Sequence, residues 1–198
     1  MPRKISETTK FEGRIFKIKD ILVRHDNGKE FSYEVMTAQG GSKGSMVAAV
    51  DEKGRVVLVE EYFAGINKPQ LCLPKGRADE HEKPVDAARR ELEEETGFRA
   101  KNLKLLCKCY LSPGYSDQLT YIYLATGLSK PAKPLQGDEV EPLKVVLLPL
   151  SKAVALAKSG KISEARAIAG LLLAQQVING EKRQSKKTKR KARPKAKN

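Results

Sequence analysis

Residues 76–98 read GRADEHEKPVDAARRELEEETGF. Pro84 suits the first turn of a helix, and Gly97 can adopt the left-handed conformation that ends one. Between them, three apolar residues follow one another at helical spacing and form a stripe suited to burial: Val85, Ala88 and Leu92. We therefore predict a helix from about residue 84 to about residue 96.

Glu91, Glu94 and Glu95 stand at positions i, i+3 and i+4 of this helix, so their carboxylates lie on one face. Like charges at that spacing repel one another, and several carboxylates together suit Mg²⁺ or Mn²⁺ carrying substrate phosphates. For three acids taken alone, a solvated acidic face with salt bridges to Arg89 and Arg90 is the simpler interpretation. The rest of the segment decides between the two.

The whole segment follows a fixed order: Gly, five residues, Glu, seven residues, then Arg-Glu-apolar-any-Glu-Glu-any-Gly-apolar. This order resembles the signature of Nudix hydrolases at every constrained position, which is far more specific than a lone glycine motif. The constrained positions are Gly76, Glu82, Arg90, Glu91, Leu92, Glu94, Glu95, Gly97 and Phe98. The resemblance implies an α/β fold, an α/β/α sandwich with a mixed sheet, over residues 45–180.

The resemblance also implies roles for individual residues. Glu91, Glu94 and Glu95 would hold Mg²⁺, with Mn²⁺ as the alternative, and the backbone carbonyl of Lys75 would complete the coordination. Glu82 and Arg90 would pair to brace the loop against the helix, and Gly76 and Gly97 would support its shape. Besides Glu95, a further catalytic glutamate is expected in the acidic loop at 137–142, to orient or deprotonate the attacking water: Glu139 or Glu141.

Two features narrow the substrate. Pro113 follows Phe98 by fifteen residues, as a proline does in the ADP-ribose pyrophosphatase branch of the family. Two positions depart from that branch: Tyr62-Phe63 stands where the branch often has an aromatic followed by Arg, and the run at residues 71–76 lacks the Glu often found three residues before the Ala-Gly of that loop. We therefore expect a nucleoside diphosphate-linked substrate, with Tyr62 and Pro113 as substrate-binding candidates. ADP-ribose is the first choice, and nucleotide sugars, NADH and diadenosine polyphosphates are alternatives.

Two other functions are weighed against this one. A Nudix enzyme acting on the 5′ end of RNA is suggested by the basic C-terminus, although such an enzyme is expected to carry basic residues around its pocket. A catalytically silent Nudix module that only binds a ligand is the third possibility. It is disfavoured because such a module need not keep all three helix carboxylates.

Flanking segments predict the remaining architecture. Alternation near 11–18, 20–25 and 31–37 indicates an antiparallel unit within residues 1–44, which in similar proteins supports a homodimer. Residues 45–51 and 55–63 read as a hairpin around a turn at 51–54. Further strands are expected at 103–111, 118–126 and 143–148. Two helices follow, at 151–158 with Ser151 as cap and at 163–179 ending at Asn179-Gly180.

The net charge of +14 is concentrated at the C-terminus. Residues 181–198 hold ten Lys or Arg residues against one acid, and they have almost no apolar side chains to bury. We predict a disordered basic tail. It either binds RNA or another polyanion weakly, or only adds solubility, and base stacking is not expected because no aromatic is interleaved.

Composition indicates one soluble domain. The 198 residues are 40% hydrophobic without a long apolar run, so no membrane span is expected. The first ten residues, MPRKISETTK, lack the apolar segment of a secretory signal. Of the three cysteines, Cys107 and Cys109 point to one face of a strand, and no metal-ligand spacing is present. Buried, reduced thiols in a cytoplasmic protein are the expectation.

Overall fold

The computed structural model describes residues 1–137 and 142–191 of the chain. Three sheets have the strand orders β1-β2-β3, β10-β5-β6 and β7-β4-β9-β8. The strands are β1 (Arg3–Glu12), β2 (Phe16–Arg24), β3 (Glu30–Ala38), β4 (Lys43–Ala49), β5 (Arg55–Phe63), β6 (Lys68–Cys72), β7 (Lys75–Arg77), β8 (Arg99–Tyr110), β9 (Leu119–Ser129) and β10 (Lys144–Pro149). The helices are the 3-10 turn η1 (Ala64–Ile66), α1 (Pro84–Thr96), α2 (Leu150–Lys158) and α3 (Ala165–Lys191).

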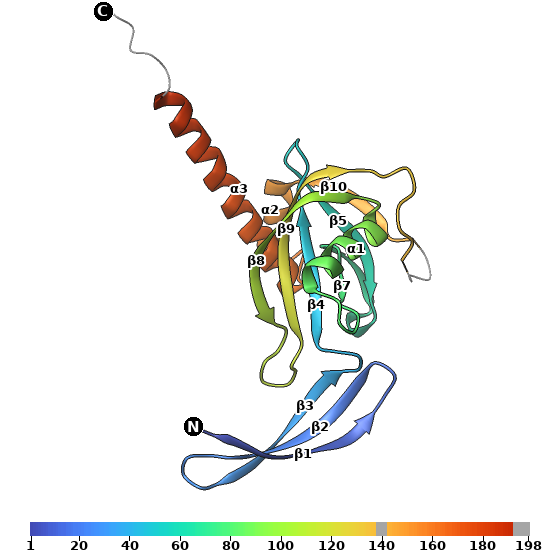
Figure 1. The fold of residues 1–198 in the computed structure, drawn as a ribbon, viewed down its shortest axis with the longest axis vertical. Coiled ribbons are helices and arrows are strands. Elements are labelled where there is room, and N and C mark those ends of the chain that lie inside the picture. Colours follow the sequence, from blue (N-terminus) through green and yellow to red (C-terminus); the bar gives the residue numbers. More distant parts are fainter. Residues whose placement is uncertain (138–141, 192–198) are drawn as a thin grey trace, which may run out of the picture.

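The N-terminal sheet β1-β2-β3 is antiparallel throughout and extends away from the body of the molecule (Figure 1). The predicted antiparallel unit is confirmed, but the predicted break between the segments 11–18 and 20–25 is wrong. Residues 16–24 form one strand, because Lys19 and Asp20, which interrupt the alternation, are balanced by Glu7 and Lys10 on β1. The sheet joins the body where the Met36 amide donates to the Tyr115 carbonyl at 2.7 Å.

In the body, β4 and β9 run parallel while β7 and β8 flank them antiparallel, so the sheet is mixed as expected. The predicted hairpin of residues 45–51 and 55–63 is wrong as a strand pair. The turn is present, since the Gly54 amide donates to the Asp51 carbonyl at 2.9 Å. Beyond the single bridge between Val50 and Val56, however, the strands diverge into different sheets.

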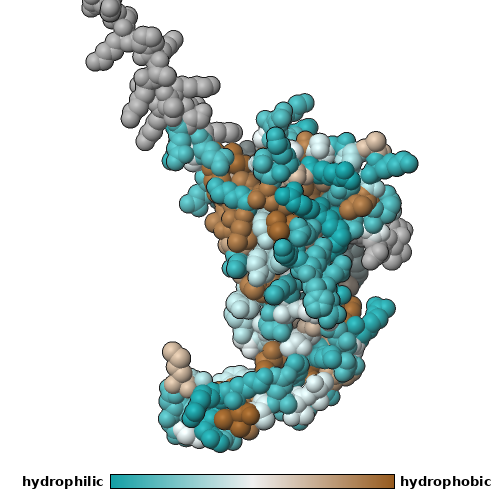
Figure 2. Space-filling model, in the orientation of Figure 1, coloured by the Kyte–Doolittle hydropathy of each residue, from teal (hydrophilic) through white to brown (hydrophobic). Residues whose placement is uncertain are grey.

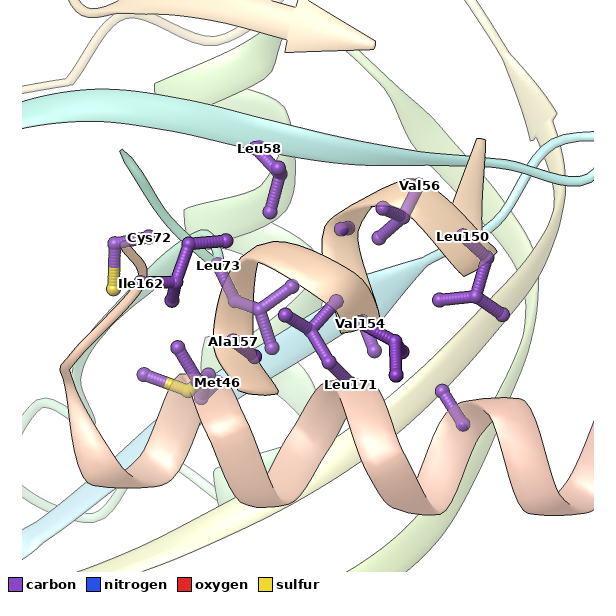
Figure 3. Close-up of a cluster of buried hydrophobic side chains, with 14 of the residues drawn as sticks. Met46, Val56, Leu58, Cys72, Leu73, Leu150, Val154, Ala157, Ile162 and Leu171 are labelled. Carbon is purple, nitrogen blue, oxygen red and sulfur yellow. The ribbon is translucent and has the colours of Figure 1, made fainter. Parts of the chain in front are cut away.

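The core has two parts, on either side of the sheet that contains β4. One part packs α1 against the sheets through Val47, Ala49, Val57, Ala88 and Leu92. The other lies under α2 and α3, and Figure 3 shows its labelled members: Met46, Val56, Leu58, Cys72, Leu73, Leu150, Val154, Ala157, Ile162 and Leu171. Because side chains alternate along a strand, β4 supplies both parts. Helices thus cover both faces, which confirms the α/β/α sandwich.

The C-terminal helices differ from the prediction at their ends. Helix α2 begins after Pro149, and no side chain caps it, so Ser151 is not its cap. Helix α3 passes through Asn179-Gly180 and ends at Lys191, so residues 181–191 are helical rather than disordered (Figure 1). A glycine within a helix lowers stability by only about 1 kcal/mol, which the preceding four turns of packed helix tolerate.

The cysteines carry free thiols, as expected, although only Cys72 is fully buried and Cys107 and Cys109 are half-buried. Burial raises the pKa of the Cys72 thiol to about 12, which keeps it protonated. Among the helices of the described residues, none is long and apolar enough to span a membrane.

Candidate active site

Helix α1 carries the acidic residues singled out in the sequence, and its bounds match the predicted helix. Pro84 occupies the first turn, and Gly97 ends the helix with φ of 70° while its amide donates to the Glu93 carbonyl at 2.8 Å. Ala88 and Leu92 are fully buried against the sheet. This packing fixes the direction in which the glutamates of the same helix project.

Two of the three predicted metal-binding glutamates are buried: Glu91 is 9% exposed and Glu95 is 8% exposed. Glu94 is half-buried. Arg90 links two of them, because its Nη1 donates to Glu91 Oε1 and to Glu94 Oε2, each at 2.8 Å. Carboxylates are rarely buried unless they are paired or bind a cation, and Arg90 supplies such a pairing for two of these three.

Arg90 also connects the helix with the loop before it. Its Nε and Nη2 donate to the two oxygens of Glu82 at 3.1 and 2.9 Å, and Nη2 donates to the Arg77 carbonyl at 3.0 Å. Glu82 in turn accepts from the Asp79 amide at 2.9 Å. The guanidinium beside it holds the pKa of Glu82 below its usual value. The expected pair therefore forms, in a fork geometry that restrains both partners.

Gly76 leaves room for a carboxylate. A Cβ atom at this position would lie 1.9 Å from Cδ of Glu91, so any other residue would displace that side chain. The Ser45 backbone lies opposite Gly76 in the β4 and β7 pairing. Ser45 Oγ is buried and has no hydrogen-bond partner among the described residues, which makes it a place for a water or another polar ligand.

Lys75 meets the site through its backbone and its side chain. Its amide donates to Glu95 Oε2 at 3.0 Å, and its ammonium pairs with Glu61 on β5 and lies 5.2 Å from the centre of the Phe63 ring. Glu61 was missed in the sequence, where it reads only as the second acid of a Glu-Glu pair at the end of a strand. Its partner Lys75 lies on another strand, so only the fold reveals the pair.

Burial raises the pKa of Glu95 to about 8, because the charged form loses its hydration. The negative charges of Glu91 and Glu61 act in the same direction, while Lys75 opposes them. A bound cation would reverse this effect by stabilising the charged carboxylate.

Carboxylate oxygens are the donors that a hard divalent cation prefers, and Gly76 leaves space for the carboxylate of Glu91. In the described residues, no group of three or more His, Cys, Asp or Glu side chains lies in an arrangement that could hold a metal ion. Instead, Arg90 holds Glu91 and Glu94, and the Lys75 amide holds Glu95.

A cavity of about 260 Å³ lies beside Glu94 and Glu95 and is lined on its other side by residues 134–137 and 142–143. Glu93 ties this second side to the helix, because it accepts from the Leu135 amide at 3.0 Å and pairs with Arg99. The predicted catalytic residues Glu139 and Glu141 lie outside the described residues. Their flanking residues Gly137 and Pro142 line the cavity.

The two candidates for substrate binding lie elsewhere. Tyr62 is exposed, and its hydroxyl bonds to Asn67. Pro113 belongs to the turn in which the Tyr115 amide donates to the Ser112 carbonyl at 2.9 Å, next to the N-terminal sheet. Neither residue lines the cavity beside Glu94 and Glu95.

Comparisons with known proteins identify the family of the chain. Residues 43–171 match the model of the NUDIX domain. The chain is 31% identical to ADP compounds hydrolase NudE of Escherichia coli (strain K12), covering 92% of this chain and 96% of that protein. It is 30% identical to ADP-ribose pyrophosphatase of Bacillus subtilis (strain 168), covering 79% and 83% respectively.

A solved structure is similar over the same extent. The crystal structure of an ADP compounds hydrolase superposes with a TM-score of 0.81 at 30% identity, and the match covers 91% of this chain and 95% of that one. The acidic helix, the sandwich and the family match all coincide in residues 43–171. The chain belongs to the Nudix hydrolase family.

Proposed function

We propose that this protein hydrolyses the diphosphate of a nucleoside diphosphate joined to another group. ADP-ribose is the first candidate substrate, with AMP and ribose 5-phosphate as products. The observation that supports this proposal most is the acidic helix α1, whose buried Glu91 and Glu95 face the Lys75-Gly76 peptide. The names of two relatives, an ADP-ribose pyrophosphatase and an ADP compounds hydrolase, support the substrate class.

Mg²⁺ is the proposed cofactor, and Mn²⁺ is the alternative. Glu91, Glu94 and Glu95, together with the carbonyl of Lys75, would hold the cations. When bound, such cations neutralise the phosphate oxygens and make a water more acidic.

The chain's own residues orient these groups. Arg90 restrains Glu91, Glu94 and Glu82 through four hydrogen bonds, so the carboxylates start from a defined geometry. We assign Glu139 or Glu141 to the attacking water, because their neighbours Gly137 and Pro142 border the cavity at Glu94 and Glu95. Tyr62 and Pro113 remain candidates for contact with distant parts of a substrate.

A broader substrate range is the second candidate. Phe63 stands where ADP-ribose-cleaving relatives often have Arg, and the run at residues 71–76 lacks the Glu that they often carry three residues before the Ala-Gly of that loop. The ADP compounds hydrolase covers almost the whole chain. Both observations favour substrates such as NADH, nucleotide sugars or diadenosine polyphosphates beside ADP-ribose.

The deciding experiment is a hydrolysis screen with Mg²⁺, with Mn²⁺ and with chelator. The substrates are ADP-ribose, GDP-mannose, NADH, diadenosine polyphosphates and 5′-triphosphorylated RNA. We expect metal-dependent release of AMP from ADP-ribose or another adenosine diphosphate compound. Preference for the RNA would favour the 5′-end enzyme, and absence of all hydrolysis would favour the ligand-binding module.

We also propose a homodimer formed through the sheet β1-β2-β3. All residues of β1 are exposed, and large apolar side chains on the sheet remain uncovered, among them Phe11 at 61% and Phe31 at 59% exposure. Figure 2 shows a few brown, hydrophobic areas on the otherwise hydrophilic N-terminal sheet below the body. A second copy of the sheet would remove them from water.

A further inference from the structure

A second cavity, of about 180 Å³, lies where the starts of β4 and β9, strand β7 and the first turn of α3 meet. In Figure 1 the starts of β4 and β9 both lie at the end of the body that faces the N-terminal sheet. No Asp or Glu belongs to the lining of this cavity, which we call the cationic pocket. Its charged lining residues are Lys43, Lys75, Arg77 and Arg166.

Only part of this positive charge is neutralised by the protein. Glu61 pairs with Lys75, and Glu164 pairs with Arg166 Nε at 2.6 Å. In the part of the chain that the structure describes, neither Lys43 nor Arg77 forms an ion pair. Cations gathered around one cavity disfavour one another, and an anion within the cavity would relieve this repulsion.

Arg166 presents its guanidinium in a fixed orientation. Its Nε is held by Glu164, and its Nη1 lies 3.3 Å from Thr120 Oγ1, so the side chain is anchored on two sides. Its Nη2 donates to none of the described residues. A planar guanidinium held in this way offers the fork that recognises phosphate oxygens.

The volume of the cationic pocket and the glycines in its lining limit the size of the ligand that it can hold. Pockets for drug-sized molecules span roughly 300–1,000 Å³, so this smaller cavity suits a single phosphate group rather than a nucleoside. Gly44 and Gly76 supply bare backbone, and a Cβ at Gly44 would lie 3.1 Å from the Gly76 carbonyl oxygen. Glycine at these positions therefore allows the close packing of β4, β7 and the Glu91 carboxylate that forms this side of the pocket.

The cationic pocket borders the acidic helix, since Lys75 and Gly76 belong to both regions and the Lys75 amide bonds to Glu95 at 3.0 Å. We propose that the cationic pocket binds a phosphate of the substrate beyond the two phosphates joined by the cleaved bond. This inference rests on the proposed function. It assigns substrates with a longer phosphate bridge, such as a dinucleoside triphosphate, a contact that ADP-ribose lacks.

The test compares KM values for diadenosine triphosphate and ADP-ribose in the full-length protein. The variants are Arg166→Met and Lys43→Met, with Lys152→Met on α2 as an exposed control. For the triphosphate, we expect KM to rise about tenfold or more in both variants, as for loss of a hydrogen bond to a charged group, with kcat within about twofold. The KM for ADP-ribose should change less than about twofold. Lys43 is exposed, so its variant stays informative if Arg166→Met fails to fold.

Equal rises of KM for both substrates, or no change for either, would overturn the assignment. Binding of inorganic phosphate, followed by ³¹P NMR in chelator, supplies a readout that needs no hydrolysis. Its affinity should fall about tenfold in Arg166→Met and Lys43→Met but stay unchanged in Lys152→Met and in Glu95→Gln. If the protein hydrolyses neither substrate, the proposed function fails and this binding comparison alone decides: equal affinity in all variants rejects the phosphate subsite. The basic C-terminus is common to all variants and cannot produce a difference among them.

Discussion

Helix α1 and the sheet β1-β2-β3 depart from ordinary burial in opposite directions. The helix buries the charged residues Glu91, Glu93 and Glu95, whereas the sheet exposes the aromatic residues Phe11 and Phe31. Charged residues are usually exposed and large apolar residues are usually buried. Buried carboxylates and clustered exposed aromatics are therefore the observations that need an explanation. We attribute the exception in the helix to chemistry and the exception in the sheet to contact with a second copy.

The largest expected effect is on the helix. Glu95→Gln removes a carboxylate charge while keeping its size, so turnover should fall by about 10³-fold, as for other preorganised electrostatic groups. Thermal melting should not worsen, because the amide oxygen of glutamine can still accept the hydrogen bond from the Lys75 amide. Steady-state hydrolysis and calorimetry check the two parts.

Glu60→Gln provides the matched control, since Glu60 lies on β5 and pairs with exposed Lys144 at 3.2 Å. Its turnover should stay within about twofold, because exposed ion pairs contribute little. Unchanged hydrolysis in Glu95→Gln would remove α1 from the active site.

The second effect concerns the contact between Glu82 and Arg90. Glu82→Gln should reduce activity less than Glu95→Gln does, and it should reduce the free energy of unfolding by about 1–3 kcal/mol, since a charged, partly buried hydrogen bond is weakened. Urea unfolding and kinetics on the same preparation measure both. Equal activity losses without a change in stability would place Glu82 in direct contact with the reacting groups.

Much of the helix was predictable because its information is local. The gaps among Gly76, Glu82 and Glu95, and the stripe that ends at Leu92, lie within one short segment. The pair of Glu61 and Lys75 was not predictable, since two separate sheets bring it together.

The same reasoning explains the errors in the fold. Residues 51–54 do form a turn, yet β4 and β5 enter different sheets because β4 pairs with β9 and β7 instead. The end of α3 was placed at Gly180 from a local stop signal, and the helix continues past it. Local signals thus predicted the elements, while the choice of partners depended on contacts distant in sequence.

The third prediction uses the raised pKa of Glu95. In chelator the folded state keeps this carboxyl protonated up to about pH 8, whereas the unfolded chain releases the proton near 4.5. The folded state binds more protons between these values, so stability should fall as pH rises from about 5 to 8. Melting temperatures across this range should fall more in the wild type than in Glu95→Gln. Parallel curves for the two proteins would contradict the buried, protonated state.

The fourth prediction tests whether the exposed aromatic residues of the sheet β1-β2-β3 contact a second copy of the chain. Phe31→Asp places a charge in the surface that we assign to the dimer, so the mass in sedimentation equilibrium should fall by half. Ile66→Asp is the control, because Ile66 is 50% exposed on η1, away from the sheet. A monomeric wild type, or an unchanged mass in Phe31→Asp, would leave the exposed aromatics without this role.

The smallest expected effect on hydrolysis is at the C-terminus, which belongs to neither region. Ending the chain after Gly180 removes ten positive charges and the contact of Lys104 with Glu181, which joins two exposed side chains at 3.8 Å. Such a pair contributes at most about 1 kcal/mol, so small-nucleotide hydrolysis should stay within about twofold of the full-length rate. Binding of RNA or DNA should be weak and steeply salt-dependent in the full protein and absent after truncation, because it depends on counterion release by these charges. If truncation abolished hydrolysis of ADP-ribose, the end of α3 would belong to the active site; a full-length preference for 5′-triphosphorylated RNA would instead make the RNA-end reaction the leading function.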